Sequence, residues 1–269
     1  TGNYSYYTEA EELIANIKMT ESALIFGSGY LTSIGVIPAL VGRNDLIIAD
    51  KLIHACAIDA SMLSRAKLKR FSHNSLDDCE NLLKKHRHNY SKCILITETI
   101  FSMDGDRADI AGLLTLAEKY DCFLISDDAH GLGIIKQKFP HSRHVQMGTL
   151  SKAAGVYGGY VAADKELIEL FINKSRSLIY STSLPYPILA ALIASLTIIK
   201  NSNIGQLALK NAQLFCKLLK LPKPESQIVN YIISDEKKQL TQKDKFLQHQ
   251  IIVAAIRPPT VPKNKARKR

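Results

Sequence analysis

The chain has 269 residues, of which 46% are hydrophobic and 22% are charged. This composition is that of a globular protein with a sizeable core, and it excludes a disordered or fibrous chain. The formal net charge is +10, but five positive residues lie among the last seven positions, 263–269. Since half of the excess lies in one tail without interleaved aromatic residues, we expect no nucleic-acid partner.

Cysteine usage and hydropathy limit the cellular setting. The five cysteines are scattered, without a Cys-x-x-Cys pair, so neither a disulfide framework nor a zinc site is predicted. No signal peptide opens the sequence, and the longest apolar stretch, 188–199, is too short to span a bilayer. We therefore expect a cytoplasmic protein without a membrane partner, and we interpret 188–199 as a buried helix. The histidine pairs His86 with His88 and His141 with His144 have loose spacing and no convincing acidic companions, so no metal site is expected.

Strand and helix patterns alternate along the first 200 residues. Thr8 followed by Glu11 resembles a capping box, which predicts a helix that begins at Thr8 and runs to about Met19. Further helices are expected at 76–85 and 110–120. Bounded apolar runs predict strands at 23–26, 46–49, 94–97, 123–126 and 160–162. This alternation predicts an α/β domain with a largely parallel sheet over residues 1–200.

The pattern changes after residue 200. A helix is expected at 204–219, followed by a proline-rich turn at Leu221–Pro224. Beyond it we expect a strand at 228–233, a helix to about residue 250 and a strand at 251–256. These elements predict a second, small α+β domain over residues 201–269.

The segment around Lys152 suggests covalent chemistry. Lys152 follows the small hydroxyl residues Thr149 and Ser151 and precedes a glycine-rich run at 155–159, so we expect it on a tight turn. A lysine in such a setting can form an imine with an aldehyde cofactor. A solvated loop lysine would show the same local pattern.

A second motif lies upstream, where the strand at 123–126 ends in Asp127, Asp128 and His130. Ligands bind beyond the carboxyl ends of strands in an open parallel sheet, so Asp127 would lie at a ligand. An aspartate there can keep a pyridine nitrogen protonated, which makes pyridoxal phosphate an electron sink. A helix-capping aspartate pair is the alternative for this motif alone. The occurrence of both motifs in this order favours a pyridoxal phosphate enzyme.

These motifs resemble those of the α-oxoamine synthases, pyridoxal phosphate enzymes of fold type I that condense an amino acid with an acyl-CoA. The resemblance covers nearly the whole sequence and includes Phe26–Tyr30, Asp50–His54, Glu98–Asp106, Asp127–Gly131, Gly148–Ala153, Ser181–Pro185 and Arg257–Pro262. It implies a large cofactor-binding domain, a truncated small C-terminal domain, and a homodimer that shares its active sites. The last motif narrows the resemblance to members that join L-alanine to pimeloyl-CoA, or to a pimeloyl carrier thioester, in biotin synthesis.

The resemblance also implies roles for particular residues. Lys152 would hold the cofactor and act as the general base, Asp127 would contact the ring nitrogen, and His54 would stack on the ring. Further cofactor contacts are implied at Gly29, Tyr30, Glu98, Ser102, His130, Thr149 and Thr182, with Thr182 directed to the phosphate of the partner subunit. Thr260 and Arg269 would face the substrate, the arginine as a clamp for the amino-acid carboxylate. Taken without the resemblance, Gly29 is a turn residue, His54 a cap or surface residue, and Thr182 a strand-end hydroxyl.

Several positions depart from the family pattern, so two alternatives stay open. The sequence begins where that pattern is under way and stops within the small domain, and Leu132 replaces the usual threonine. One alternative is a truncated, non-catalytic relative that keeps the cofactor fold. The other is an α-oxoamine synthase for different substrates, such as glycine with a short acyl-CoA, as in aminolevulinate synthesis, or serine with a long acyl-CoA.

Overall fold

The computed structural model describes residues 3–137, 139–232, 236–256 and 267–268. The chain divides into two compact units. The first comprises Thr1–Phe101 and Arg107–Gln206, and the second comprises Ser102–Asp106 and Leu207–Arg269. Each unit has its own sheet.

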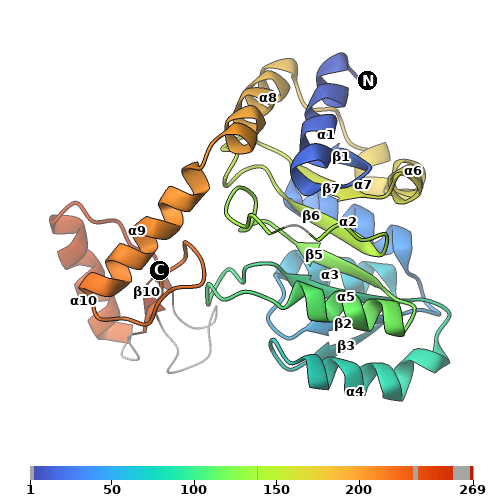
Figure 1. Cartoon of the computed structure of the whole chain (residues 1–269), viewed down its shortest axis with the longest axis horizontal. Helices are drawn as coiled ribbons and strands as arrows, with labels where there is room; N and C mark the ends of the chain where they lie inside the picture. Colours follow the sequence, from blue (N-terminus) through green and yellow to red (C-terminus); the bar gives the residue numbers. More distant parts are fainter. Residues whose placement is uncertain (1–2, 138, 233–235, 257–266, 269) are drawn as a thin grey trace. The chain divides into compact units, whose positions relative to one another are not determined.

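A seven-stranded sheet organises the first unit (Figure 1), with the order β1-β7-β6-β5-β4-β2-β3. Its strands are β1 (Ser22–Phe26), β2 (Leu46–Asp50), β3 (Lys67–Phe71), β4 (Cys93–Glu98), β5 (Phe123–Asp127), β6 (His144–Thr149) and β7 (Gly159–Ala163). β7 runs antiparallel to both of its neighbours, and the remaining pairs are parallel. The predicted, largely parallel sheet is confirmed, and β3 and β6 are strands that the sequence patterns did not predict.

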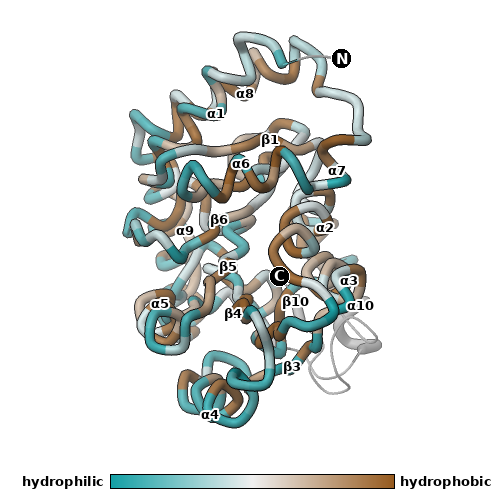
Figure 2. The backbone as a smooth tube through the Cα atoms, turned by 90° about the vertical axis from the view of Figure 1, so that its right-hand side faces the viewer, coloured by the Kyte–Doolittle hydropathy of each residue, from teal (hydrophilic) through white to brown (hydrophobic). Residues whose placement is uncertain are grey.

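Helices cover both faces of this sheet (Figure 1). One face carries α2 (Gly29–Leu40), α3 (Ala55–Ser64) and α6 (Lys165–Lys174). The other carries α1 (Ser5–Lys18) and α8 (Tyr186–Asn201) towards β1, and α4 (Leu76–His86) and α5 (Ile110–Lys119) towards β3. Two short helices, η1 (Arg87–Asn89) and α7 (Arg176–Ile179), complete the unit. Figure 2 shows hydrophobic residues along β1 and α2, whereas α4 and α6 alternate in hydropathy, as helices with one solvated face do.

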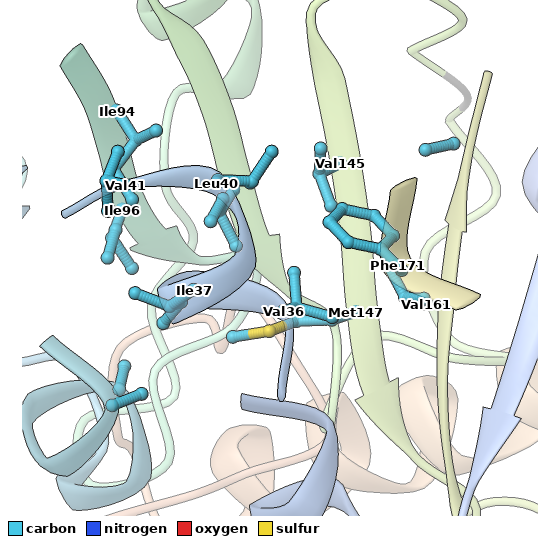
Figure 3. Packing of buried hydrophobic residues seen from close by; sticks show 14 of the residues in the cluster. Val36, Ile37, Leu40, Val41, Ile94, Ile96, Val145, Met147, Val161 and Phe171 are labelled. Atoms are coloured by element: carbon cyan, nitrogen blue, oxygen red, sulfur yellow. The ribbon is translucent and has the colours of Figure 1, made fainter. Parts of the chain in front are cut away.

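The core beneath α2 fixes this helix on the sheet (Figure 3). Val36 and Leu40 of α2 pack among residues such as Ile96 of β4 and Met147 of β6, and all four are buried. Because side chains alternate along a strand, Leu95 points to the opposite face, into the core under α4 and α5. Each such side chain stabilises the fold by roughly 1.5–3 kcal/mol through burial. The start of α2 is therefore held at a constant position relative to the strand ends.

Two local expectations were wrong. Helix α1 begins at Ser5 after an N-cap, Tyr4, that makes no side-chain cap, and Thr8 lies inside the helix. Glu11 does not close a capping box, because its Oε1 accepts a hydrogen bond of 2.9 Å from the backbone N–H of Ile25 in β1. Helix α8 contains the apolar stretch 188–199, but only a stripe of three residues is buried, namely Leu189, Leu192 and Leu196. It packs along one side instead of being enclosed.

The second unit contains most of α9 (Ile204–Leu218), together with α10 (Glu236–Gln248) and a three-stranded antiparallel sheet of order β8-β10-β9. Its strands are β8 (Tyr231–Ile232), β9 (Ala255–Ile256) and β10 (Arg267–Lys268), and β9 is shorter than the predicted strand at 251–256. The loop 102–106 joins this unit because Ser226 and Asn230 donate hydrogen bonds to its carbonyl groups. Within the described residues no single helix is long and apolar enough to cross a membrane, and α8 and α9 reach that length only when counted together across their break.

Candidate functional site

The predicted site residues of the first unit gather where parallel strands end, at what we term the carboxyl edge of the sheet. β4 ends at Glu98, β5 at Asp127 and β6 at Thr149, and Glu98 and Asp127 are paired in register. His54 follows β2, and Gly29 follows β1. Because all five strands run in the same direction, their ends lie at the same edge, which is where open α/β sheets bind ligands.

Asp127 is half-buried at this edge. Its Oδ1 accepts a hydrogen bond of 2.9 Å from the backbone N–H of Ala129, and its carbonyl oxygen accepts one of 2.9 Å from Thr99 N. Burial raises the pKa of the Asp127 carboxyl, while the Ala129 N–H and the charges of His54 and Lys152 act in the opposite direction. A histidine and a lysine thus lie within electrostatic reach of this carboxylate.

His54 is the N-cap of α3, and its side chain is exposed. Its Nδ1 accepts a hydrogen bond of 3.2 Å from the backbone N–H of Cys56. The Cys56 thiol lies 3.0 Å from the same nitrogen, and burial raises its pKa to about 11, so this thiol is a donor. When the ring is neutral, Nδ1 accepts this hydrogen bond and Nε2 carries the proton. His54 thus forms the helix cap that was the alternative for this residue without the resemblance, and the cap fixes the ring at the end of the β2 connection.

Asp50 shapes the connection between β2 and α3. This buried carboxylate accepts hydrogen bonds of 2.8 Å from the backbone N–H groups of Leu52 and Asn74, and it contacts His73 Nδ1 at 3.0 Å. Asp50 belongs to the motif Asp50–His54, but no separate role was predicted for it. Its contacts hold the segment that delivers His54 to the carboxyl edge.

The start of α2 lies directly against the end of β6. A Cβ atom on Gly29 would be 3.0 Å from the Thr149 Cβ, and one on Gly159 would be 2.5 Å from backbone atoms of Ser28. Ser28 caps α2 by accepting a hydrogen bond of 3.1 Å from Leu31 N. The Thr149 hydroxyl is 2.8 Å from that of Ser151. The first N–H groups of a helix lack intrahelical partners, so this crowded corner combines free donors with two hydroxyls and suits an anion.

Lys152 lies in the connection between β6 and β7, and its side chain is exposed. The expected tight turn is confirmed, since the Lys152 carbonyl accepts a 3.1 Å hydrogen bond from Gly155 N, and Gly155 has a φ of 63°. Among the described residues, no hydrogen-bond acceptor holds the Lys152 ammonium. The amine is therefore available for chemistry.

The other predicted residues are less closely grouped. Glu98 is buried, His130 is half-buried in the turn after β5, and Tyr30 is exposed and donates to Asp59 Oδ2 at 3.1 Å. Thr182 is exposed and lines a separate cavity of about 300 Å³ that also includes Tyr7 and Glu11. Ser102 lies in the second unit, and Thr260 and Arg269 lie outside the described residues. In the described part of the chain, no three His, Cys, Asp or Glu side chains form a metal-binding group.

Sequence reasoning missed a buried ion pair behind Asp127. Lys18 Nζ lies 2.6 Å from Asp128 Oδ2, and both side chains are almost fully buried. The helical spacing of Ala10, Ile14 and Lys18 places the lysine on the apolar face of α1, and this spacing was the available signal. The partner could not be read from it, since 110 residues separate the two.

The mostly parallel sheet, with this set of residues at its carboxyl edge, defines the chain as a fold-type-I protein of the pyridoxal phosphate-dependent class. Residues 1–268 match the family model described as aminotransferase class I and II. The chain belongs to this family, and within it to the α-oxoamine synthases.

Known proteins support this assignment. The 8-amino-7-oxononanoate synthase of Granulibacter bethesdensis is 41% identical over all of this chain and 72% of its own length. A solved structure of serine palmitoyltransferase from Sphingomonas wittichii shares the fold with a TM-score of 0.90 at 24% identity, and covers 99% of this chain and 71% of its own. The crystal structure of 8-amino-7-oxononanoate synthase from Francisella tularensis has a TM-score of 0.79 at 26% identity, over 99% and 81% of the two chains.

Proposed function

We propose that the chain is a pyridoxal phosphate-dependent C-acyltransferase that condenses L-alanine with pimeloyl-CoA, or a pimeloyl carrier thioester. The products are 8-amino-7-oxononanoate, carbon dioxide and the free thiol, in a step of biotin synthesis. The observation that carries this proposal is that Asp127, His54 and Lys152 lie at or after the ends of β5, β2 and β6, with His54 and Lys152 within electrostatic reach of Asp127. The names of the curated relatives give the product, 8-amino-7-oxononanoate. The substrates are those that the resemblance of the motif Arg257–Pro262 implies.

The residues at this edge suit pyridoxal phosphate. The corner formed by Gly29, Thr149 and Ser151 offers helix N–H groups and hydroxyls for a phosphate. Asp127 offers a carboxylate for the pyridine nitrogen, and Lys152 offers an amine without a hydrogen-bond acceptor in the described chain. Tyr30, Glu98 and His130 would add contacts around the ring.

The protein residues divide the work of the reaction. When bound, pyridoxal phosphate supplies the electron sink that makes an amino-acid α-proton acidic. Lys152 would hold the cofactor through its amine, and when that amine is free it would remove the amino-acid α-proton as general base. Asp127 would keep the ring nitrogen of the cofactor protonated, and the His54 ring would cover one face of the cofactor.

Substrate contacts and assembly complete the proposal. Thr260 and Arg269 would face the substrate, with the arginine on the carboxylate of alanine. A homodimer would bring Thr182 to the phosphate of the other subunit, and its exposure in the single chain is consistent with that role. Support for association comes from exposed apolar side chains on and beside α3, namely Leu52, Met62 and Leu63. The free, buried cysteines suit the cytoplasmic location that we propose.

The proposal is tested by absorbance titration of the purified chain with pyridoxal phosphate. We expect a visible band that Lys152→Ala abolishes and that Lys174→Ala, an exposed lysine of α6, leaves unchanged. L-Alanine should alter the band, and addition of pimeloyl-CoA should then release free thiol and carbon dioxide in equal amounts.

Each contrary outcome has its own meaning. Absence of the band in the wild-type chain would refute the cofactor assignment. A band that responds to alanine without thiol release would identify a non-catalytic relative. A response to glycine or L-serine in place of alanine would identify an α-oxoamine synthase with other substrates.

A further inference from the structure

Two consecutive carboxylates at the end of β5 have different surroundings. Side chains alternate between the faces of a strand, so neighbours at its end point in opposite directions. Asp127 has His54 and the Cys56 thiol of α3 within electrostatic reach. Asp128 contacts Lys18 of α1, which covers the other face. One carboxylate thus faces the proposed cofactor site, and the other lies behind it.

The Asp128 carboxylate is held by three donors. Its Oδ2 accepts hydrogen bonds from Lys18 Nζ at 2.6 Å and from the Tyr160 hydroxyl at 3.2 Å, and its Oδ1 accepts one from Thr99 Oγ1 at 2.7 Å. The donors come from α1, from β7 and from the segment after β4. A Cβ on Gly131 would lie 2.1 Å from Asp128 Oδ1, so the turn closes over the carboxylate. This group cannot move without disturbing all of them.

Stability alone does not account for the pair. Desolvation of two charges largely cancels their attraction, so a buried ion pair contributes little net stability compared with apolar side chains of the same size. Lys18 nevertheless lies on the apolar face of α1, one turn after Ile14, and its own carbonyl accepts a hydrogen bond of 3.2 Å from Gln146 Nε2. The arrangement places one positive charge behind the end of β5.

Asp128 and its ion pair affect Asp127 in two ways, through the backbone and through charge. The backbone of Asp128 is fixed, because its N–H donates to Met147 O at 2.6 Å and its carbonyl oxygen accepts from Gly131 N at 3.0 Å. This fixes the adjoining residue as well. The negative charge of Asp128 favours protonation of Asp127. Because the Lys18 ammonium lies 2.6 Å from Asp128 Oδ2, we infer that it offsets that effect. A protonated Asp127 could not hold a proton on a pyridine nitrogen.

We propose that Lys18 is a positioning residue, which acts through Asp128 to keep Asp127 ionised and correctly placed. The inference rests on the role of Asp127 proposed above. Lys18 touches neither substrate nor cofactor. The charged and titratable groups that face Asp127 are His54, Cys56, Lys152, Asp128 and Tyr160, together with Glu98, its partner in the sheet register; those that face Asp128 are Lys18, Tyr160 and His144. Lys18→Met and Asp128→Asn each remove one charge from this field, and Asp128→Asn also alters the acceptor of the Thr99 and Tyr160 hydroxyls.

The test measures the dissociation constant of pyridoxal phosphate as a function of pH, by fluorescence or visible absorbance. Binding should weaken on the acid side as Asp127 becomes protonated. In Lys18→Met the uncompensated Asp128 charge should move this acid midpoint up by about one pH unit, as expected for a unit charge close by. In Asp128→Asn the uncompensated Lys18 charge should move it down. The double variant Lys18→Met/Asp128→Asn should return it towards the wild-type value.

A merely structural role would give a different result. It would weaken binding in both single variants without moving their midpoints apart, and this outcome would overturn the inference. Ile14→Val, a change at a buried residue of the same helix, serves as the control for lost packing and should leave the midpoint unchanged. If Lys18→Met does not fold, Asp128→Asn and the double variant still give the downward shift and its reversal.

The same titrations separate the two proposals. If Asp127→Asn removes the acid midpoint while the Lys18 and Asp128 variants behave like the wild type, only the role of Lys18 fails. If the wild-type chain binds no pyridoxal phosphate, or if Asp127→Asn leaves the profile unchanged, the proposed function fails and this inference fails with it.

Discussion

Glu11 makes the stability of the chain depend on pH near neutrality. Its carboxyl lies between α1 and β1, and Oε1 accepts the Ile25 N–H. Burial raises the pKa of Glu11 from 4.5 to about 7, with the Ile25 hydrogen bond acting in the opposite direction. The folded chain therefore binds a proton that the unfolded chain releases above pH 4.5. The stability that the protonated Glu11 contributes is present in full below pH 4.5 and is lost as the pH rises through about 7.

The size of the effect follows from the shift. A difference of this size corresponds to at most about 3 kcal/mol above pH 7, since one pKa unit is about 1.4 kcal/mol. Glu11→Gln keeps an acceptor for Ile25 N but cannot ionise. We expect this variant to unfold at nearly the same urea concentration as the wild type at pH 4.5 and to be more stable than it at pH 8.

The measurement is urea unfolding of both chains at pH 4.5, 6, 7 and 8. Glu12→Gln is the matched control, because Glu12 is the next residue of α1 and is exposed. A stability difference between Glu11→Gln and the wild type that stays constant across these pH values would refute the reasoning. So would an equal pH-dependent gain in Glu12→Gln.

Three further substitutions test other parts of the first unit. Gly159→Ala should lower the free energy of unfolding in urea by about 1–3 kcal/mol and weaken phosphate binding, because the new Cβ would press on Ser28. The control Gly42→Ala meets no atom within 4 Å and should be neutral. Equal effects of the two substitutions would contradict this. Asp50→Ala should cost about 2–4 kcal/mol, since two backbone N–H groups lose their acceptor, and a loss below 1 kcal/mol would contradict the role of Asp50. Burial lowers the pKa of His144 to about 4, so stability should fall as the pH drops below 6.5, and His144→Gln should flatten this decline between pH 7 and 5. An unchanged decline in that variant would show that another group is responsible.

The strands that sequence patterns predicted share one property, which is burial of apolar side chains on both faces. β2 and β4 are buried along their whole lengths and read as continuous apolar runs. β3 was missed because it lies at the sheet edge and three of its five residues are charged. β6 was missed because it is polar and yet fully buried. Its His144 contacts Ser126 at 2.7 Å, and its Gln146 donates to Lys18 O, so its polar groups are paired by distant segments.

The residues of the candidate site also differ in whether local sequence could predict them. Residues within contiguous motifs, such as Asp127 and Lys152, could be singled out from the sequence because the chemistry of each residue type is specific. Asp50 and Lys18 act through partners that only the folded chain brings close, and no local pattern names those partners. Single-residue chemistry was therefore predictable, whereas the support behind it required the tertiary structure.

The antiparallel direction of β7 has a kinetic consequence for Lys152. Because β7 returns beside β6, the connection that carries the lysine starts and ends at the same edge, where Thr149 is paired with Gly159 and Leu150 N donates to Gly158 O at 2.9 Å. A crossover connection would have led the chain away from this edge. The segment that carries the amine is instead tethered at both ends, so the amine would stay at a high effective concentration beside a ligand bound at this edge. A reaction between the two would be intramolecular.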